Sequence, residues 1–99
     1  MALIFKEHQS QHGPLYVVID KNLLGKIFEE GKLQLDLTKK FFDGEEATKE
    51  ELKKKLKYAR HIHLTGKEAV ALGVEMDLVD PENILFIKNV PHAEVIIDA

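Results

Sequence analysis

The alternation of apolar and polar residues along the chain predicts its secondary structure. Apolar runs at residues 2–6 and 15–19 flank the polar stretch EHQSQHGP, which predicts a β-hairpin with a long loop. Apolar residues then recur at helical spacing across Lys21–Glu30, directly after Asp20, a residue type that caps helix N-termini. This segment is predicted to form a helix that ends at Gly31, where a left-handed terminator is favoured.

The middle of the chain predicts a strand, a loop and a helix. Leucines alternate with polar residues across Leu33–Leu37, as in a half-buried strand, and Phe42–Ala47 contains the Asp-Gly turn signal. Thr48 and Glu51 have the spacing of a capping box, in which each side chain bonds the other residue's backbone amide. A helix is therefore predicted over residues 49–60.

The last third of the chain predicts another helix and a second hairpin. Thr65 and Glu68 repeat the capping-box spacing, and the apolar runs 84–88 and 93–97 are joined by the short sequence NVPH. The predicted order is β-β-α-β-α-α-β-β. Hairpins at both ends favour a mainly antiparallel sheet with helices packed on it, so we expect one compact α+β domain over residues 1–99.

Charge is distributed unevenly over a chain whose net charge is −3. Residues 39–67 carry nine basic side chains against five acidic ones, a net +4, whereas residues 68–99 carry one against seven. Helix 49–60 buries only a narrow apolar stripe, so its wide face is predicted to be a basic, partner-binding surface made of Lys49, Lys53, Lys54, Lys57 and Arg60. The alternative is a solvated Lys/Glu surface with no binding role.

Composition argues against several classes of protein. The chain has no cysteine, which fits a reducing compartment, and no apolar run approaches the ~20 residues that span a bilayer. We therefore expect a cytoplasmic protein with no membrane association. The single arginine, Arg60, leaves little capacity to read bases, so sequence-specific DNA binding is not expected. The aromatic residues lie mostly at core-like positions and predict no platform for stacking bases.

Histidines supply the alternative chemistry. In an extended segment, His61 and His63 lie on the same side of the chain, whereas in a helix they diverge. His92 is a candidate third ligand, and Glu68 or Glu94 a candidate oxygen ligand, for a metal ion such as zinc. The competing interpretation is that Ile62 points into the core while the histidines simply flank it.

Gly66 and Lys67 form a candidate anion site. They lie at the predicted start of a helix, where free backbone amides bind phosphate or carboxylate groups. The simpler interpretation is that Gly66 allows the chain to enter the helix tightly.

Three stretches resemble a known family: NLLGKIFEEGKLQLDL, FFDGE and HLTGKEAVALGVEMDLVDPENILFIKNVPHAEV. They are similar to the archaeal family catalogued as domain of unknown function 424. The resemblance covers nearly the whole chain and implies an archaeal, cytosolic, compact α+β protein. It implies no catalytic residue, and a link to translation comes only from the family's general setting.

These observations lead to one hypothesis and one alternative. The hypothesis is a non-catalytic accessory domain, without a cofactor, that docks on a ribonucleoprotein or protein partner through helix 49–60. The alternative is a small metal- or anion-dependent enzyme centred on His61, His63 and His92.

Overall fold

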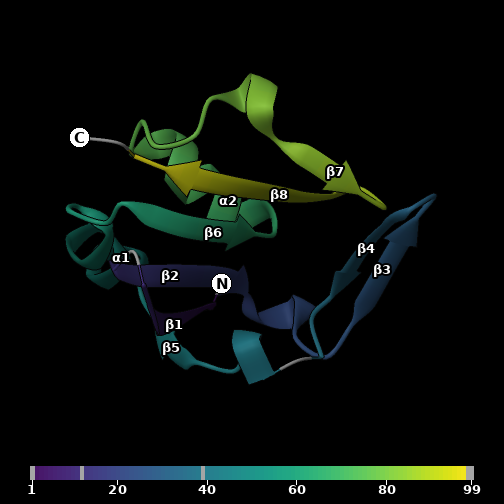
Figure 1. The fold of residues 1–99 in the computed structure, drawn as a ribbon, viewed down its shortest axis with the longest axis horizontal. Helices are drawn as coiled ribbons and strands as arrows, with labels where there is room; N and C mark the ends of the chain where they lie inside the picture. The colour runs from purple at the N-terminus through teal and green to yellow at the C-terminus, as the bar shows by residue number, and fades with distance from the viewer. Residues whose placement is uncertain (1, 12, 39, 98–99) are drawn as a thin grey trace.

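A six-stranded mixed sheet forms the centre of the protein (Figure 1). The computed structural model describes residues 2–11, 13–38 and 40–97, without the side chain of Phe41. The strand order is β5-β1-β2-β6-β8-β7, in which β2 and β6 run parallel and the other neighbours run antiparallel. The strands are β1 (Leu3–Ser10), β2 (Gly13–Asp20), β5 (Glu45–Ala47), β6 (His61–Thr65), β7 (Leu85–Ile87) and β8 (Val90–Ile96).

Different layers cover the two faces of this sheet. The helices α1 (Lys49–Leu56) and α2 (Lys67–Glu75) pack on one face, where α2 lies behind β6 and β8 in Figure 1. The small hairpin of β3 (Ile27–Glu30) and β4 (Leu33–Asp36) contributes to a separate apolar cluster with residues of the other face. The carboxyl ends of β2 and β6 are buried, from Val17 to Asp20 and from Leu64 to Thr65, because both faces of the sheet are covered there.

In the described part of the chain, three short 3₁₀ turns complete the fold: η1 (Lys21–Leu23), η2 (Lys40–Phe42) and η3 (Pro81–Asn83). Within the described residues, no helix has the length and apolar character needed to cross a membrane. The α+β class is confirmed, but the predicted order of elements is not.

The helix predicted over Lys21–Glu30 is wrong. Only Lys21–Leu23 form a helical turn, and the chain then passes through Gly25 with a φ of 82° and enters strand β3. Helical spacing of apolar residues misled the prediction, because β3 pairs with β4 and leaves Ile27 52% exposed. Gly31 has a positive φ as expected, but it turns a hairpin and does not end a helix.

Several strand boundaries also differ from the predictions. The first hairpin is longer, with pairing from Leu3↔Asp20 to Ser10↔Gly13, so the predicted long loop is mostly strand; His12 lies outside the described residues. Glu45–Ala47, predicted as loop, pairs with β1 as an edge strand. Strand β6, missing from the predicted order, is the inner strand that makes the sheet mixed. A C-terminal hairpin is present as predicted, but it turns at Lys88 and Asn89, and Val90–His92 of the predicted connection NVPH belong to strand β8.

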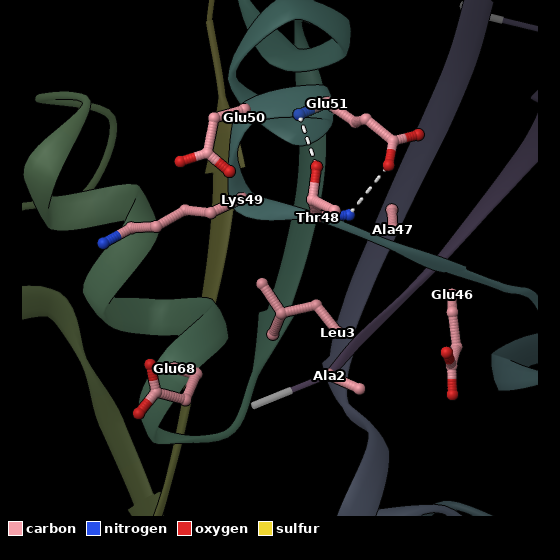
Figure 2. Close-up of a pocket in the computed structure, with 9 residues that line it drawn as sticks. All are labelled: Ala2, Leu3, Glu46, Ala47, Thr48, Lys49, Glu50, Glu51 and Glu68. Carbon is pink, nitrogen blue, oxygen red and sulfur yellow. Dashed lines mark hydrogen bonds between the residues drawn. The ribbon is translucent and has the colours of Figure 1, made fainter.

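The first capping box is confirmed (Figure 2). The Glu51 amide donates to Thr48 Oγ1 at 3.1 Å, and the Thr48 amide donates to Glu51 Oε1 at 3.2 Å. The helix buries Leu52 and Leu56 completely and ends at Leu56, which is short of the predicted residue 60.

The capping box predicted at Thr65 and Glu68 is not formed, and Asp20 caps α2 instead. The Asp20 carboxylate accepts the Glu68 amide at 3.1 Å and the Ala69 amide at 2.8 Å, so it caps α2 from the end of β2. Gly66 is the N-cap residue, with a φ of 107°, and a Cβ at this position would lie 2.3 Å from Asp20 Cγ. Thr65 instead bonds His92. Only glycine at position 66 allows the carboxylate to approach the helix.

We expect Asp20→Asn to lower the free energy of unfolding by about 1–3 kcal/mol. The amide group keeps the shape of the carboxylate but turns an NH₂ toward one of two backbone donors, one of which is buried. Denaturant unfolding followed by circular dichroism measures the loss. Asp43→Asn at an exposed position is the matched control, and equal stability of the two variants would contradict the proposed role of Asp20.

Candidate functional site

The basic face of α1 is partly neutralised by α2. Lys49 Nζ and Lys53 Nζ lie 3.4 Å and 3.0 Å from the two carboxylate oxygens of Glu75. Hydrogen bonds from Lys53 and then Lys49 lower the pKa of the Glu75 carboxyl group. Two of the five predicted binding residues are thus engaged in holding the two helices together.

The remaining cations lie toward and beyond the C-terminal end of α1. Lys54, Lys57 and Arg60 are exposed, and among the described residues no ion pair joins them to an acidic side chain. Tyr58 lies between them in the sequence with 84% of its surface exposed, and Lys57 Nζ is 5.6 Å from the centre of its ring. We call Lys54, Lys57, Tyr58 and Arg60 the basic surface.

Tyr58 was not among the residues predicted to bind a partner. In the predicted helix 49–60, position 58 lies about 200° around the helix axis from Leu56, which is buried, so helical spacing indicates an exposed ring. Together with its location in a run of basic residues, this spacing was the available signal.

The histidines lie on the sheet face opposite to the helices. Because β6 is extended, Ile62 and Leu64 enter the helix-covered core while His61 and His63 point to the other face. Glu94 is opposite His63 in the pairing of β6 with β8. Its two carboxylate oxygens lie 3.3 Å from His61 Nε2 and 3.3 Å from His63 Nε2.

His92 lies beside this group but is held differently. It pairs with Thr65 across the strands, and its Nδ1 is 2.8 Å from the Thr65 hydroxyl oxygen. The rings of His63 and His92 meet edge to face with centres 6.0 Å apart. The other oxygen candidate, Glu68, lies on α2 and lines a pocket with the N-terminal residues.

Burial lowers the pKa of both His63 and His92 below the ordinary value of 6.5. Glu94 opposes this effect at both rings, while the neighbouring histidines, His61 for His63 and His63 for His92, add to it. Both imidazoles therefore favour the neutral form at pH 7, which is the form that donates a lone pair.

The predicted anion position at Gly66 and Lys67 holds an anion of the chain itself. The Asp20 carboxylate takes the amides of Glu68 and Ala69, and the Gly66 amide donates to the Pro91 carbonyl oxygen at 2.9 Å. These three amides are therefore not free for an external phosphate.

A pocket of about 730 Å³ opens between the chain start, β5 and the first turns of both helices (Figure 2). Four glutamates line it together with Lys49, and their charge repels phosphate: Glu46, Glu50, Glu51 and Glu68. The pocket therefore does not extend the basic surface.

The fold defines a small α+β domain with a mixed six-stranded sheet. The chain belongs to the family described as "Protein of unknown function (DUF424)", whose model matches residues 7–97, so the resemblance found in the sequence is confirmed. No curated protein matches it. It is similar to the crystal structure of an uncharacterized conserved protein from Methanopyrus kandleri, with a TM-score of 0.80 and 15% identity over 100% of this chain and 96% of that one. At this identity the likeness shows the fold alone.

The lowered pKa values predict that the protein loses stability as pH falls below about 6.5. The unfolded chain binds protons on these two histidines more readily than the folded chain, so acid favours unfolding. Urea unfolding between pH 7.5 and pH 5 measures the slope, which should flatten in the double variant His63→Gln/His92→Gln. Asp20→Asn, which lowers stability without removing either ring, should keep the slope. An unchanged slope in the double variant would assign the acid sensitivity to other groups.

Proposed function

We propose that this protein is a non-catalytic accessory domain that docks on the RNA backbone of a ribonucleoprotein through its basic surface. The observation that carries the proposal is the exposed Tyr58 ring among Lys54, Lys57 and Arg60. The family match leaves the activity open, so the proposal depends on the chemistry of these side chains.

The charge of the basic surface favours a polyanion. Lysines at positions 54 and 57 are three residues apart on α1 and its C-cap and therefore neighbours on one side of the helix. Arg60 follows directly before β6 and adds a third cation. Cations without an acidic partner bind phosphates by releasing counterions, which yields affinity that falls with salt.

The exposed ring of Tyr58 favours RNA over an acidic protein surface as the partner. An aromatic side chain this exposed has little role in the core. Lys57 Nζ lies over the ring, and with 84% of the residue exposed the ring still offers surface to an unpaired base. Base stacking on an aromatic residue contributes about 1–3 kcal/mol and tolerates any base. A surface of three cations and one ring therefore supports contact with single-stranded RNA, without reading its sequence.

Two ion pairs reduce the set of residues that are expected to bind the partner. Lys49 and Lys53 were predicted binding residues, but their ion pairs with Glu75 make them poor phosphate ligands. Binding is therefore expected to depend on Lys54, Lys57 and Arg60. A partner that acts in translation remains part of the proposal.

Charge reversal tests the electrostatic part. For a fluorescent single-stranded RNA oligonucleotide, Lys54→Glu/Lys57→Glu should weaken binding and reduce the slope of log K against log salt by about 1.4, because two phosphate contacts are lost. Fluorescence anisotropy at several salt concentrations measures both quantities.

The matched control is Lys26→Glu/Lys32→Glu, which makes the same charge change at two exposed lysines outside the basic surface. Equal weakening by the two double variants would show that net charge alone governs binding and would contradict a defined surface. No salt-dependent binding by the wild type would contradict RNA as the partner and favour a protein.

Replacement of the exposed ring tests the stacking part. Tyr58→Ala should weaken RNA binding by about 5- to 100-fold while the salt slope stays the same, because stacking releases no counterions. Tyr58→Phe keeps the ring and should bind like the wild type. If Tyr58→Ala binds normally, Tyr58 has no role in docking.

A further inference from the structure

We propose that His61, His63 and Glu94 form a binding site for one divalent transition-metal ion of the zinc class. The site lies on the sheet face opposite the helices and shares no residue with the basic surface. The inference goes beyond the proposed docking function and does not depend on it.

The donor atoms are those that zinc prefers. Two imidazole nitrogens and one carboxylate oxygen form a common set of three protein ligands at sites that keep a fourth position for water or a ligand. The same set also suits other first-row ions of similar size and softness, among which cobalt is a useful spectroscopic substitute. Magnesium and calcium are disfavoured, because they take mostly oxygen ligands.

The two histidine–carboxylate distances are close to those of a tetrahedral centre. In a zinc site with metal–ligand distances of about 2.1 Å, neighbouring ligand atoms lie about 3.4 Å apart. Glu94 Oε1 lies 3.3 Å from His61 Nε2, Glu94 Oε2 lies 3.3 Å from His63 Nε2, and one ligand atom from each of the three residues lies within 4.8 Å of the others. Binding of an ion requires the side chains to rotate until one Glu94 oxygen and both imidazole nitrogens lie about 3.4 Å apart.

The sheet fixes the positions of these residues and leaves their side chains accessible to solvent. Between the two histidines, Ile62 is fully buried, and beside Glu94 the residues Ala93 and Val95 are 4% and 7% exposed. Buried neighbours on both strands fix the backbone of the site, so the ligands are ordered before an ion binds. The side chain of His61 is 35% exposed and that of Glu94 is 47% exposed, which gives an ion access from solvent.

This ligand set differs from the three histidines that the sequence suggested. His92 is opposite Thr65 in the strand pairing, two positions along β8 from Glu94, and its Nδ1 contacts the Thr65 hydroxyl group. Glu94 takes the third position, and His92 lies against the outer side of His63. The competing interpretation is that Glu94 is only a hydrogen-bond and ion-pair partner of the two imidazoles.

Metal titration of the untagged, full-length protein distinguishes these interpretations. After dialysis against a chelator, Zn²⁺ is titrated by calorimetry at pH 7.5, and Co²⁺ binding is followed by its visible absorption. We expect saturation at one ion per chain, a rise in the thermal unfolding midpoint that chelator reverses, and cobalt bands typical of four- or five-coordination. Absence of saturable binding overturns the proposal.

Substitutions of Glu94, which is exposed, and of His61, which is half-exposed, provide the decisive variants. Glu94→Gln and His61→Ala should each weaken zinc binding by at least about 10-fold, since even second-shell changes cost 10- to 100-fold. The comparison variant His92→Ala removes a neighbouring imidazole that is outside the proposed ligand set and should weaken zinc binding less than Glu94→Gln does, because it removes no ligand atom. Circular dichroism in chelator verifies that each variant is folded.

The pattern of losses identifies the true ligands. If His92→Ala abolishes binding while Glu94→Gln does not, the site is the three-histidine cluster and the proposed set is wrong. If all variants bind zinc like the wild type, the ion binds elsewhere and the proposal fails. RNA binding is not part of the assay, so neither result bears on the docking proposal.

Discussion

The hydrogen bonds from the first amides of α2 to the Asp20 carboxylate set the positions on which both candidate sites depend. Asp20 ends β2, and α2 follows β6, so the bonds join the neighbouring carboxyl ends of the two parallel strands. Once α2 is fixed, Glu75 at its far end binds Lys49 and Lys53 of α1. That pairing leaves Lys54, Lys55, Lys57 and Arg60, on α1 and just beyond it, without an acidic partner among the described residues. The same placement of β6 brings its two histidines beside β8.

The sequence predicted those parts of the fold that depend on neighbouring residues. The capping box of Thr48 and Glu51 is confirmed, because both partners lie within one helical turn and need no tertiary contact. Asp20 was correctly interpreted as a helix cap but assigned to the next segment, since its true partners lie 48 and 49 residues away. The false helix Lys21–Glu30 has the same cause: apolar spacing fits both a helix and a small hairpin whose partner strand decides the outcome.

The candidate sites were predictable to the same limited extent. Alternation along an extended segment correctly predicts that His61 and His63 share a side, but only the register of β6 against β8 shows that Glu94, and not His92, lies opposite His63. Register depends on pairing across more than 25 residues, which no local pattern contains. Similarly, the basic composition near α1 was visible in the sequence, whereas the ion pairs of Lys49 and Lys53 with Glu75 depend on how α2 lies beside α1.

The central claim, that the basic surface contacts RNA in a larger particle, is tested most directly by retention of partners from an archaeal extract on the immobilised protein at low salt, with and without ribonuclease. The account predicts a retained ribonucleoprotein that disappears after ribonuclease treatment, elutes with moderate salt and is absent when the column carries Lys54→Glu/Lys57→Glu. Retention that is unaffected by ribonuclease, or that this variant retains in full, would contradict the account.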